Sequence, residues 1–580
     1  MQTRSKSGIT KPRHPFPIAL FASPPTPSIP TTYKQATKDP RWLQAMNDEL
    51  TALHRTHTWT LVPPHSAQNL VGSKWVFRIK QHADGSIERY KARLVAKGFN
   101  QLEGIDYTET FSPVAKPVTI RILLSIAVQN DWHISQLDVT NAFLHGHLTE
   151  EVFMTQPPGF EDLQKPNYVC KLHRSLYGLK QAPRAWYEEL HDALLSLGFQ
   201  TSAADTSLFL KIDSSATFIL VYVDDIVITG NNPSYCTQLI SQLGSQFAIK
   251  DLGPLHYFLG IEVHRTASGL FLSQTKYTTD LLSKTDMLDA KPFPSPATTA
   301  KLASDSGELL SYPTSYRSIV GALQYLTWTR PDISYSVNQV CQFLHAPTTT
   351  HLTAVKRILR YLKATPDYGL PIHKGEPHLT AFCDADWAGD PNDRRSTTGS
   401  CIFLGANLIS WSAKKQTTVA RSSTEAEYRA LATTTADVLW ICSLLKELHV
   451  FLNHPPLFHC DNISAIALAA NPIFHARTKH IEVDYHFIRH LVTSRAIAIQ
   501  HLPSHSQLAD IFTKGLPAER FLTLRSKLIT RHPRLRLRGD DKQSNEEHTK
   551  ITLIQPLSSR TTNQEHTTKN RIEHSRPSSR

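Results

Sequence analysis

The pattern of hydrophobic and polar positions changes its period several times along this chain. Asp39 and Pro40 are typical of a helix start, and apolar residues then recur at helical spacing as far as Leu53. Residues 59–99 instead alternate between apolar and polar positions, with Asp84-Gly85 as a hairpin signal. The pattern therefore predicts a first helix followed by a basic, strand-rich lobe.

The next part of the chain mixes both periods. Residues 133–139 have the pattern of a strand and residues 255–272 that of a hairpin, whereas 182–197 and 233–247 have the period of helices. Residues 141–148 have the composition of a turn that leads into a helix. These patterns predict a mixed α+β unit.

A second unit follows a polar connection. Residues 290–315 are rich in Pro, Ser, Thr and Ala, which is typical of a linker, and 316–365 have a helical pattern. Beyond them the sequence predicts strands at 379–384, 401–405, 408–412, 456–460 and 496–501, and helices at 423–449, 463–470, 481–492 and 506–515. Because no internal repeat relates this region to the first unit, we expect two different folds.

Composition narrows the class of protein. A chain of 580 residues with 40% hydrophobic residues is too long for one core, so several domains are expected. Its net charge of +12 favours a polyanionic partner such as nucleic acid. It has no run of 18 apolar residues, no apolar segment of signal-peptide type, and seven cysteines without a CxxC pair. We therefore expect a soluble, intracellular protein that is neither secreted nor membrane-bound.

Both ends of the chain differ from its body. Residues 1–38 hold six Lys or Arg, seven prolines and no Asp or Glu, which predicts a basic disordered lead-in. Residues 531–580 carry eleven basic and six acidic residues without a sustained period. We therefore predict a basic disordered tail over residues 521–580.

Residues 218–229 form an apolar run broken only by Asp224 and Asp225. The β-branched and aromatic residues on both sides predict two strands, with the acidic pair at the tight turn of a hairpin. Two adjacent carboxylates repel each other unless a cation lies between them, so a divalent ion is a natural partner. The alternative is an ordinary hairpin with a solvated acidic turn.

Asp138, at the end of the predicted strand 133–139, supplies a third carboxylate. Three carboxylates from adjoining strands can bind two divalent ions roughly 3.5–4 Å apart for phosphoryl transfer. Further motifs accompany them in order: Lys91-Ala-Arg-Leu-Val-Ala-Lys-Gly-Phe99, Leu176-Tyr-Gly-Leu-Lys-Gln-Ala-Pro-Arg-Ala-Trp-Tyr187, Tyr222-Val-Asp-Asp225 and Leu259-Gly-Ile-Glu-Val263. Together these motifs resemble the reverse transcriptase of copia-type LTR retrotransposons, with similarity from about Lys34 to Thr530.

The resemblance implies roles for individual residues. Asp138, Asp224 and Asp225 match the metal-binding carboxylates of the palm, and Lys91 and Arg93 match basic finger positions that hold the incoming triphosphate. A solvated charged strand face is the alternative for the two basic residues.

Two more positions are implied to lie near the nucleotide. Phe143 resembles the gate against a ribose 2′-hydroxyl, although a core aromatic is the alternative. Gln181 lies in the segment that binds nucleotide and template.

The second unit has its own acidic set. Asp384 and Asp461 end predicted strands, Glu427 lies on a helix opened by the capping box of Ser422, and Asp510 lies on the last predicted helix. Four carboxylates on separate elements suit a two-metal site that activates water against a phosphodiester. The motifs Asp384-Ala-Asp-Trp387, Ser423-Thr-Glu-Ala-Glu-Tyr428, His459-Cys-Asp-Asn462 and Ala509-Asp-Ile-Phe-Thr-Lys514 resemble the ribonuclease H domain of the same family.

The family implies an α+β and α/β multidomain chain in which a right-hand polymerase with fingers, palm and thumb precedes a connection region and a ribonuclease H-like domain. The expected parts are a lead-in from the integrase–polymerase junction (1–38), the reverse transcriptase (39–289), the linker and helical connection (290–375), the ribonuclease H-like domain (376–520) and the tail (521–580). Capsid and integrase residues are not recognisable, so a truncated copy is expected.

Two functions of different class remain open. The chain is either an RNA-directed DNA polymerase with ribonuclease H activity, or an inactive remnant that binds nucleic acid electrostatically. A third possibility is a DNA-templated cellular polymerase, but the attached ribonuclease H motifs argue against this hypothesis. The hypothesis of an active enzyme implies two Mg²⁺ ions per site, with Mn²⁺ as a substitute. Its partners are an RNA template, a DNA primer, an RNA–DNA hybrid and dNTPs, and the oligomeric state is left open.

Overall fold

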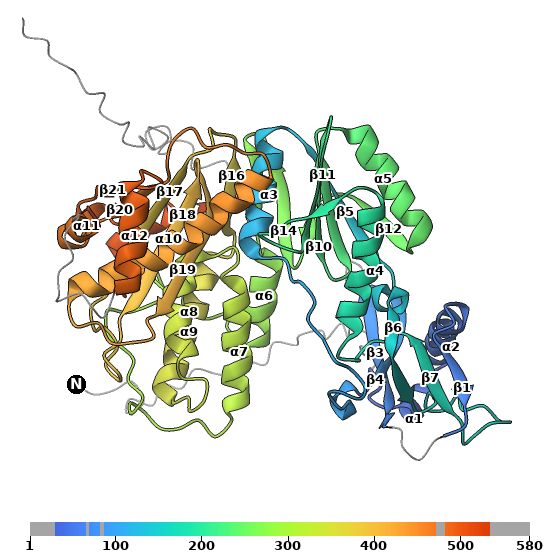
Figure 1. The fold of residues 1–580 in the computed structure, drawn as a ribbon. Coiled ribbons are helices and arrows are strands. Elements are labelled where there is room, and N and C mark those ends of the chain that lie inside the picture. Colours follow the sequence, from blue (N-terminus) through green and yellow to red (C-terminus); the bar gives the residue numbers. More distant parts are fainter. Residues whose placement is uncertain (1–28, 65–68, 82–85, 471–481, 534–580) are drawn as a thin grey trace, which may run out of the picture. The chain divides into compact units, whose positions relative to one another are not determined.

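The computed structural model describes residues 29–64, 69–81, 86–470 and 482–533 (Figure 1). The chain divides into two compact units, Met1–Arg531 and His532–Arg580. The elements below all belong to the first unit. Within the described residues, no helix is both long and apolar enough to cross a membrane.

The predicted first helix is confirmed. Helix α2 (Pro40–Arg55) begins at Asp39, whose carboxylate accepts the amide of Arg41, and follows a short helix α1 (Tyr33–Ala36). Its apolar face packs against the hairpin of β3 (Ser73–Gln81) and β4 (Ile87–Ala96). The expected turn at Asp84-Gly85 lies outside the described residues.

A second sheet completes this lobe. Its order is β1-β7-β6-β2, formed by Trp59–Val62, Val169–Arg174, His147–Met154 and Leu70–Val71. Residues 141–148 were expected to be a turn that leads into a helix; they form one 3-10 turn, η3 (Ala142–His145), that leads into strand β6 instead. Asn141 has a φ of 54°, and a Cβ at Gly146 would lie 2.7 Å from the backbone of Ala185, so the chain turns sharply here.

A six-stranded sheet carries the first acidic set. Its order is β12-β5-β11-β10-β9-β8. Strand β10 (Ala216–Tyr222) has both faces buried, because Phe218 and Leu220 contact one hydrophobic core while Ile219 and Val221 contact another. The strand therefore has a continuous apolar run instead of an alternating pattern. The remaining strands are β5 (His133–Val139), β8 (Gln200–Thr201), β9 (Leu208–Ile212), β11 (Asp225–Gly230) and β12 (Ile249–Pro254).

Helices cover both faces of this sheet. Helices α4 (Ala182–Ser196) and α5 (Pro233–Gln246) contribute to the core on one face, and α3 (Pro117–Gln129) contributes to the core on the other. Enclosure on both faces fixes the strand register, since a slip by one residue would exchange the two buried sets. The acidic strand ends are therefore held in place by the core beneath them.

A third sheet joins distant segments in the order β13-β14-β15-β16-β22. Strand β16 lies in the part assigned to the connection, and β22 lies beyond residue 520. The strands are Tyr257–Phe258, Ile261–Thr266, Gly269–Ser273, Tyr368–His373 and Thr530–Arg531. The helices between β15 and β16 are α6 (Thr275–Lys284), α7 (Pro313–Leu326), α8 (Ser334–Cys341) and α9 (Thr349–Ala364), so the helical pattern over 316–365 is confirmed.

The two expected disordered ends reach too far inward. Helix α14 (Ala518–Arg525) buries Phe521 and Leu524, and β22 pairs with β16, so the boundary at 520 falls inside an ordered element. Helix α1 likewise lies within the expected lead-in. The composition of the ends does not reveal these three short elements, because none of them is long enough to show a hydrophobic period. Residues 1–28 and 534–580 lie outside the described ranges.

The last sheet has the order β19-β18-β17-β20-β21. Strands β17, β18 and β19 are antiparallel neighbours, whereas β20 and β21 run parallel to β17. Figure 1 shows the long helix α10 lying along this sheet, where it packs against β17 and β18. The strands are Leu379–Ala385, Thr397–Leu404, Asn407–Lys415, Leu457–Cys460 and Ala498–His501.

The helices of this part follow the predicted order with one difference. They are α10 (Ser423–Glu447), α11 (Ile463–Ala470), α12 (Glu482–Thr493) and α13 (Asp510–Thr513). The helix expected over 506–515 is replaced by the 3-10 turn η6 (Ser504–Ser506) and by the single turn of α13. The expected mixed α+β organisation is confirmed, with a last sheet whose topology differs from that of the six-stranded sheet.

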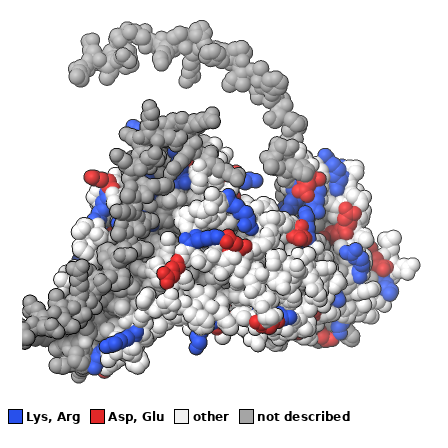
Figure 2. Space-filling view, turned by 90° about the horizontal axis from the view of Figure 1, so that it is seen from above, with Lys and Arg blue, Asp and Glu red and all other residues white. Residues whose placement is uncertain are grey.

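Charge is dispersed on the face shown in Figure 2. Small groups of Lys and Arg lie between groups of Asp and Glu and broad areas of other residues. Among the described residues visible there, the excess positive charge is not gathered into one continuous basic surface. Recognition of a polyanion on that face would therefore depend on local groups.

Candidate active sites

The first acidic set lies at the β10–β11 hairpin. Tyr222 is paired with Asp225, so Val223 and Asp224 form the two-residue turn and Asp225 is the first residue of β11. The expectation that both carboxylates occupy the turn is therefore wrong by one residue. Val223 has a φ of 56°, which is uncommon for a β-branched residue.

The neighbouring strand brings the third carboxylate to the same place. In the β5–β11 ladder Asp138 is the direct partner of Asp225. The backbone amide of Val139 donates to the carbonyl of Asp224 at 2.9 Å, and the indole of Trp186 donates to the carbonyl of Val223 at 2.6 Å. The structure thus brings all three predicted carboxylates together on a turn that is fixed from two sides.

Electrostatics at this turn favour a cation. Burial, followed by the charges of Asp224 and Asp138, raises the pKa of Asp225 to about 6. Burial also raises the pKa of Asp224. A carboxylate is the form that binds a divalent ion, and an ion between these groups would relieve both the desolvation and the repulsion. The residues present therefore fit divalent ions.

The two predicted basic residues lie near this centre. The charges of Arg93 and Lys91, both on β4, act to lower the pKa of Asp224 against the effect of burial. Burial lowers the pKa of Lys91, and the neighbouring Arg93 adds to this. Two cations beside three carboxylates suit a ligand that carries both phosphate and metal.

Tyr177 is a site residue that the sequence did not single out. Its ring lies 4.2 Å from the guanidinium carbon of Arg93 and 5.0 Å from the ring of Phe143. Burial raises its pKa to about 12, and Asp224 is among the charges that act on it. The motif that contains Tyr177 was the available signal, but a motif does not say which of its side chains faces the centre. Half-buried Phe143 thus lies in an aromatic pair beside the basic residues.

Gln181 has an internal position. It is fully buried, its carbonyl oxygen accepts from the side chain of Gln101 at 2.9 Å, and its amide donates to the carbonyl of Asp106 at 2.8 Å. The structure therefore does not place its amide group at the carboxylates. A role in nucleotide binding stays a prediction.

The second acidic set converges from four elements. Asp384 lies near the end of β17, Asp461 directly follows β20, Glu427 lies in the second turn of α10, and Asp510 begins α13. Ser422 caps α10 as predicted, because its hydroxyl accepts the amide of Glu425 at 3.2 Å. The structure brings the four predicted carboxylates into one electrostatically connected group.

Burial dominates the chemistry of this group. It raises the pKa of Glu427, and the charges of Asp384, Cys460 and Asp461 add to the rise. Burial likewise raises the pKa of Asp384. One ligand atom each of Glu427, Cys460 and Asp461 lies within 4.8 Å of the other two, and the Oε2 atom of Glu427 is buried without a hydrogen-bond partner. An orphaned carboxylate oxygen beside other ligands fits a divalent ion.

Lys514 is a further residue of this site that the sequence did not single out. Its ammonium lies 2.6 Å from Oδ1 of Asp510 and 3.4 Å from Oδ2 of Asp384. Burial acts to lower the pKa of Lys514, but the attraction of the two carboxylates outweighs it and raises the pKa. Arg520 also pairs with Asp510, and Ser504 donates to Asp461 at 2.7 Å. Cations of the chain therefore hold one side of the acidic group.

Replacement of Lys514 by Ala is expected to destabilise the protein in the absence of divalent ions by about 1–3 kcal/mol. The side chains of Asp384 and Asp510 are 2% and 6% exposed, so Asp384 would remain buried without a cation and Asp510 would keep only Arg520. Thermal unfolding in EDTA checks this, with the exposed Lys527→Ala as matched control. Equal unfolding temperatures for the two variants would contradict it.

Comparison with known proteins first gives a class. The family model "Reverse transcriptase (RNA-dependent DNA polymerase)" matches residues 56–299. The chain is 54% identical over 538 residues to the Retrovirus-related Pol polyprotein from transposon RE1 of Arabidopsis thaliana. It is 33% identical over 308 residues to the putative transposon Ty5-1 protein of Saccharomyces cerevisiae, all of which it covers. The chain belongs to the copia-type retrotransposon Pol polyproteins.

The extent of these matches is unequal. The alignment to the RE1 polyprotein covers 92% of this chain and 37% of that protein. The polyprotein from transposon TNT 1-94 of Nicotiana tabacum is 40% identical over 509 residues, which are 85% of this chain and 38% of the relative. The chain thus spans little more than a third of these polyproteins.

Solved structures are more distant. Prototype foamy virus protease-reverse transcriptase aligns over 84% of this chain and 77% of its own, with 13% identity and a TM-score of 0.25. The LC11 ribonuclease H1 aligns over 24% of this chain and 93% of its own, with 16% identity and a TM-score of 0.20. These scores are too low to transfer any residue role.

Proposed function

We propose that this chain is an RNA-directed DNA polymerase that also cleaves the RNA strand of RNA–DNA hybrids. The observation that carries the first activity is the convergence of Asp138, Asp224 and Asp225 beside Lys91 and Arg93. Membership in the reverse transcriptase family supports it. The second activity is supported by the convergence of Asp384, Glu427, Asp461 and Asp510, three of which are buried.

At the polymerase site, Asp138, Asp224 and Asp225 would hold two Mg²⁺ ions, with Mn²⁺ as a substitute. Such ions polarise the primer 3′-hydroxyl and neutralise the pyrophosphate that leaves. The charges of Lys91 and Arg93 on β4 act on Asp224, and both residues would bind the triphosphate of the dNTP. The ring of Phe143, packed on Tyr177, would lie beside the sugar and oppose a 2′-hydroxyl.

At the second site, Asp384, Glu427, Asp461 and Asp510 would hold divalent ions that activate water toward the RNA phosphodiester. Thr513 donates to Asp384 and Ser504 donates to Asp461, so two of the carboxylates are oriented before any ligand arrives. Lys514 balances charge at Asp510. Such second contacts hold ligand groups in a productive geometry.

The proposed partners follow from the reaction. They are an RNA template, a DNA primer, dNTPs and the hybrid that synthesis generates. We propose an intracellular place of action, in a cytoplasmic particle or the nucleus, because these partners are found there.

Primer extension on poly(rA)/oligo(dT) tests the proposal. We expect the full chain to extend the primer with Mg²⁺, to be inactive after chelation with EDTA, and to recover when Mg²⁺ is restored, because the half-buried carboxylates of Asp138, Asp224 and Asp225 need a cation to bind phosphate. Incorporation of labelled dTTP is the measurement. A poly(dA)/oligo(dT) duplex gives the comparison with a DNA template.

Two outcomes would overturn the proposal. A chain that binds the hybrid but extends the primer equally poorly with Mg²⁺ and with EDTA is an inactive remnant that only binds nucleic acid. Preference for the DNA template would indicate a DNA-templated polymerase.

A further inference from the structure

Trp387 is an exposed aromatic residue beside the second acidic site. It has 55% of its surface exposed, although a tryptophan is usually well buried. It follows Asp384 by three residues, and three residues of chain reach at most about 11 Å. The Cα atoms of Asp384 and Trp387 are therefore within that distance of each other, and Trp387 is not one of the proposed metal ligands.

The orientation of the ring is fixed by a hydrogen bond. The indole Nε1 of Trp387 donates to the carbonyl of Ala420 at 3.1 Å. Ala420 lies just before the cap of α10 and packs with Ala385 and Ala426 in a small buried cluster. Asp384 lies on β17 and Glu427 lies on α10. The ring thus connects the loop that follows β17 with the segment that precedes α10. Its polar edge is satisfied and its faces remain available.

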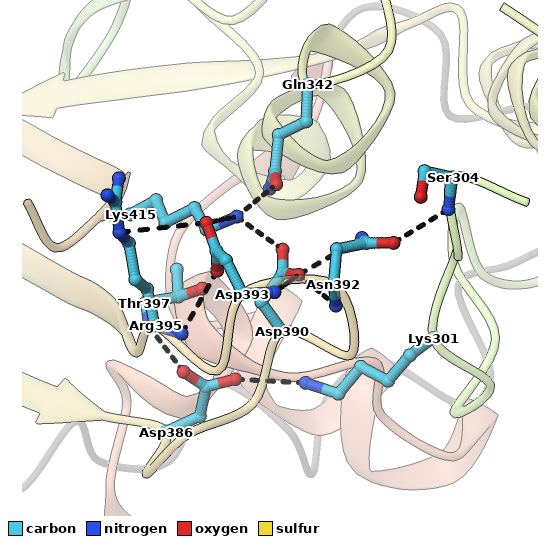
Figure 3. A network of polar contacts seen from close by, with 10 residues as sticks. All are labelled: Lys301, Ser304, Gln342, Asp386, Asp390, Asn392, Asp393, Arg395, Thr397 and Lys415. Carbon is cyan, nitrogen blue, oxygen red and sulfur yellow. Dashed lines mark hydrogen bonds and ion pairs between the residues drawn. The ribbon is translucent and has the colours of Figure 1, made fainter. Parts of the chain in front are cut away.

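The loop on which the ring stands is held from both sides (Figure 3). Asp386 pairs with Lys301 at 2.9 Å and accepts the amide of Thr397. Lys415 lies 2.7 Å from Asp390 and 2.9 Å from Asp393. These contacts anchor the chain directly before Trp387 and a few residues after it.

The backbone beside the ring is constrained as well. Ala388 has a φ of 51°, and its amide donates to the hydroxyl of Ser396 at 3.0 Å. A Cβ at Gly389 would lie 1.6 Å from Oδ2 of Asp386, so a side chain at this position would displace the Asp386 carboxylate from its pair with Lys301. A strained conformation persists where the surroundings determine it, and such positions concentrate at binding sites. The loop holds the ring outward and keeps it from collapsing onto the core.

The surroundings of the ring indicate its ligand. Val419, next to the residue that anchors the indole, is 48% exposed, and Arg421 is exposed on the other side of Ala420. An aromatic face with an apolar neighbour and a cation matches a nucleotide, which offers an apolar sugar and base beside a phosphate. A second protein would need a larger apolar area than this rim provides.

We propose that Trp387 binds the nucleotide of the RNA–DNA hybrid that lies next to the phosphodiester cleaved at the second site. This inference rests on the proposed ribonuclease function and deepens it. The ring face packs against the nucleotide, and Arg421 attracts its phosphate. The contact places the strand over the carboxylates before cleavage.

The first test is kinetic, with the full chain and a short RNA–DNA hybrid in Mg²⁺. We expect Trp387→Ala to raise KM for hybrid cleavage by about 5- to 100-fold with kcat little changed, and Trp387→Phe to restore most of the loss. Phe451→Ala is the matched control, because Phe451 is 70% exposed in the same part of the chain and lies outside the site. Its KM should equal that of the wild type.

The second test detects the contact directly and does not depend on cleavage. A hybrid with 5-iodouridine beside the cleavage position is irradiated with the Asp384→Asn protein, and the crosslinked peptide is sequenced. We expect the crosslink at Trp387 and its loss in the Trp387→Ala double variant. A wild-type chain that cleaves no hybrid but crosslinks at Trp387 would refute the ribonuclease function and leave the contact standing.

Three results would overturn the inference. An unchanged KM for Trp387→Ala would remove the binding role. An equal loss in Trp387→Phe, or a lower unfolding temperature in both variants, would show that the hydrogen bond to Ala420 matters and the ring face does not. A crosslink elsewhere in the chain would assign the nucleotide to another surface.

Discussion

Primer extension on an RNA template is expected to fall by about 10²- to 10⁴-fold when Asp225 is replaced by Asn, while hybrid cleavage changes less than about twofold. Asn keeps the shape of the side chain but removes the charge that would bind a divalent ion. Asp225 faces Asp138 directly in the ladder, so the lost carboxylate is one that would hold an ion beside Asp138. The measurement is incorporation of labelled dTTP on poly(rA)/oligo(dT), alongside cleavage of a preformed hybrid.

The fold of this variant should be intact. Burial and neighbouring charges raise the pKa of Asp225 to about 6, so its ionised form, which still predominates at neutral pH, costs more free energy in the folded protein than in the unfolded chain. A neutral Asn removes that cost, and the unfolding temperature in EDTA should therefore equal or exceed that of the wild type. Asp192→Asn, at a carboxylate that is 81% exposed on α4, is the control for charge removal and should extend normally. Normal extension by Asp225→Asn would refute the assignment of the polymerase site.

The converse separation is expected at the second site. Asp384→Asn should reduce hybrid cleavage by about 10²- to 10⁴-fold and leave primer extension unchanged, because Asp384 is buried at the centre of a different carboxylate group. Cleavage is measured with a hybrid whose RNA strand carries an end label. The exposed Glu519→Gln, at the start of α14, is the matched control.

Two results would weaken this assignment. Loss of both activities in Asp384→Asn would mean that the two sites are not independent, or that folding is damaged. Thermal unfolding separates these explanations. Damaged folding would lower the unfolding temperature below that of Glu519→Gln, whereas coupled sites in an intact fold would leave the two temperatures close.

The acidic residues could be predicted because their signals are local. Asp224 and Asp225 interrupt a run that is otherwise apolar on both faces, and Asp384 ends a strand of the same kind. A charge in such a run is visible without knowledge of the fold. The order of the motifs then related the carboxylates to one another.

Other features depend on contacts that no local period reveals. Lys514 pairs with Asp384, which lies 130 positions earlier in the sequence. The single turn of α13 before Lys514 is too short to predict where the Lys514 side chain points. Strand β22 has two residues, which cannot show alternation, and exists because β16 offers it an edge. Arg121 lies in an apolar helix yet donates to the carbonyl of Ile409 at 2.8 Å. Tertiary packing determines each of these positions.

Val223 gives the polymerase turn a property beyond its geometry. A left-handed β-branched residue costs roughly 1–3 kcal/mol, and Gly or Asn would occupy this conformation at lower cost. The indole of Trp186, which donates to the carbonyl of Val223, and the amide of Val139, which donates to the carbonyl of Asp224, hold the turn in this conformation. The hairpin tip is thus held in a strained backbone conformation by its neighbours. The acidic group owes its position to this strained conformation and not to the most relaxed one. A substitution at this position that made the turn more stable would therefore make the placement of the carboxylates less precise.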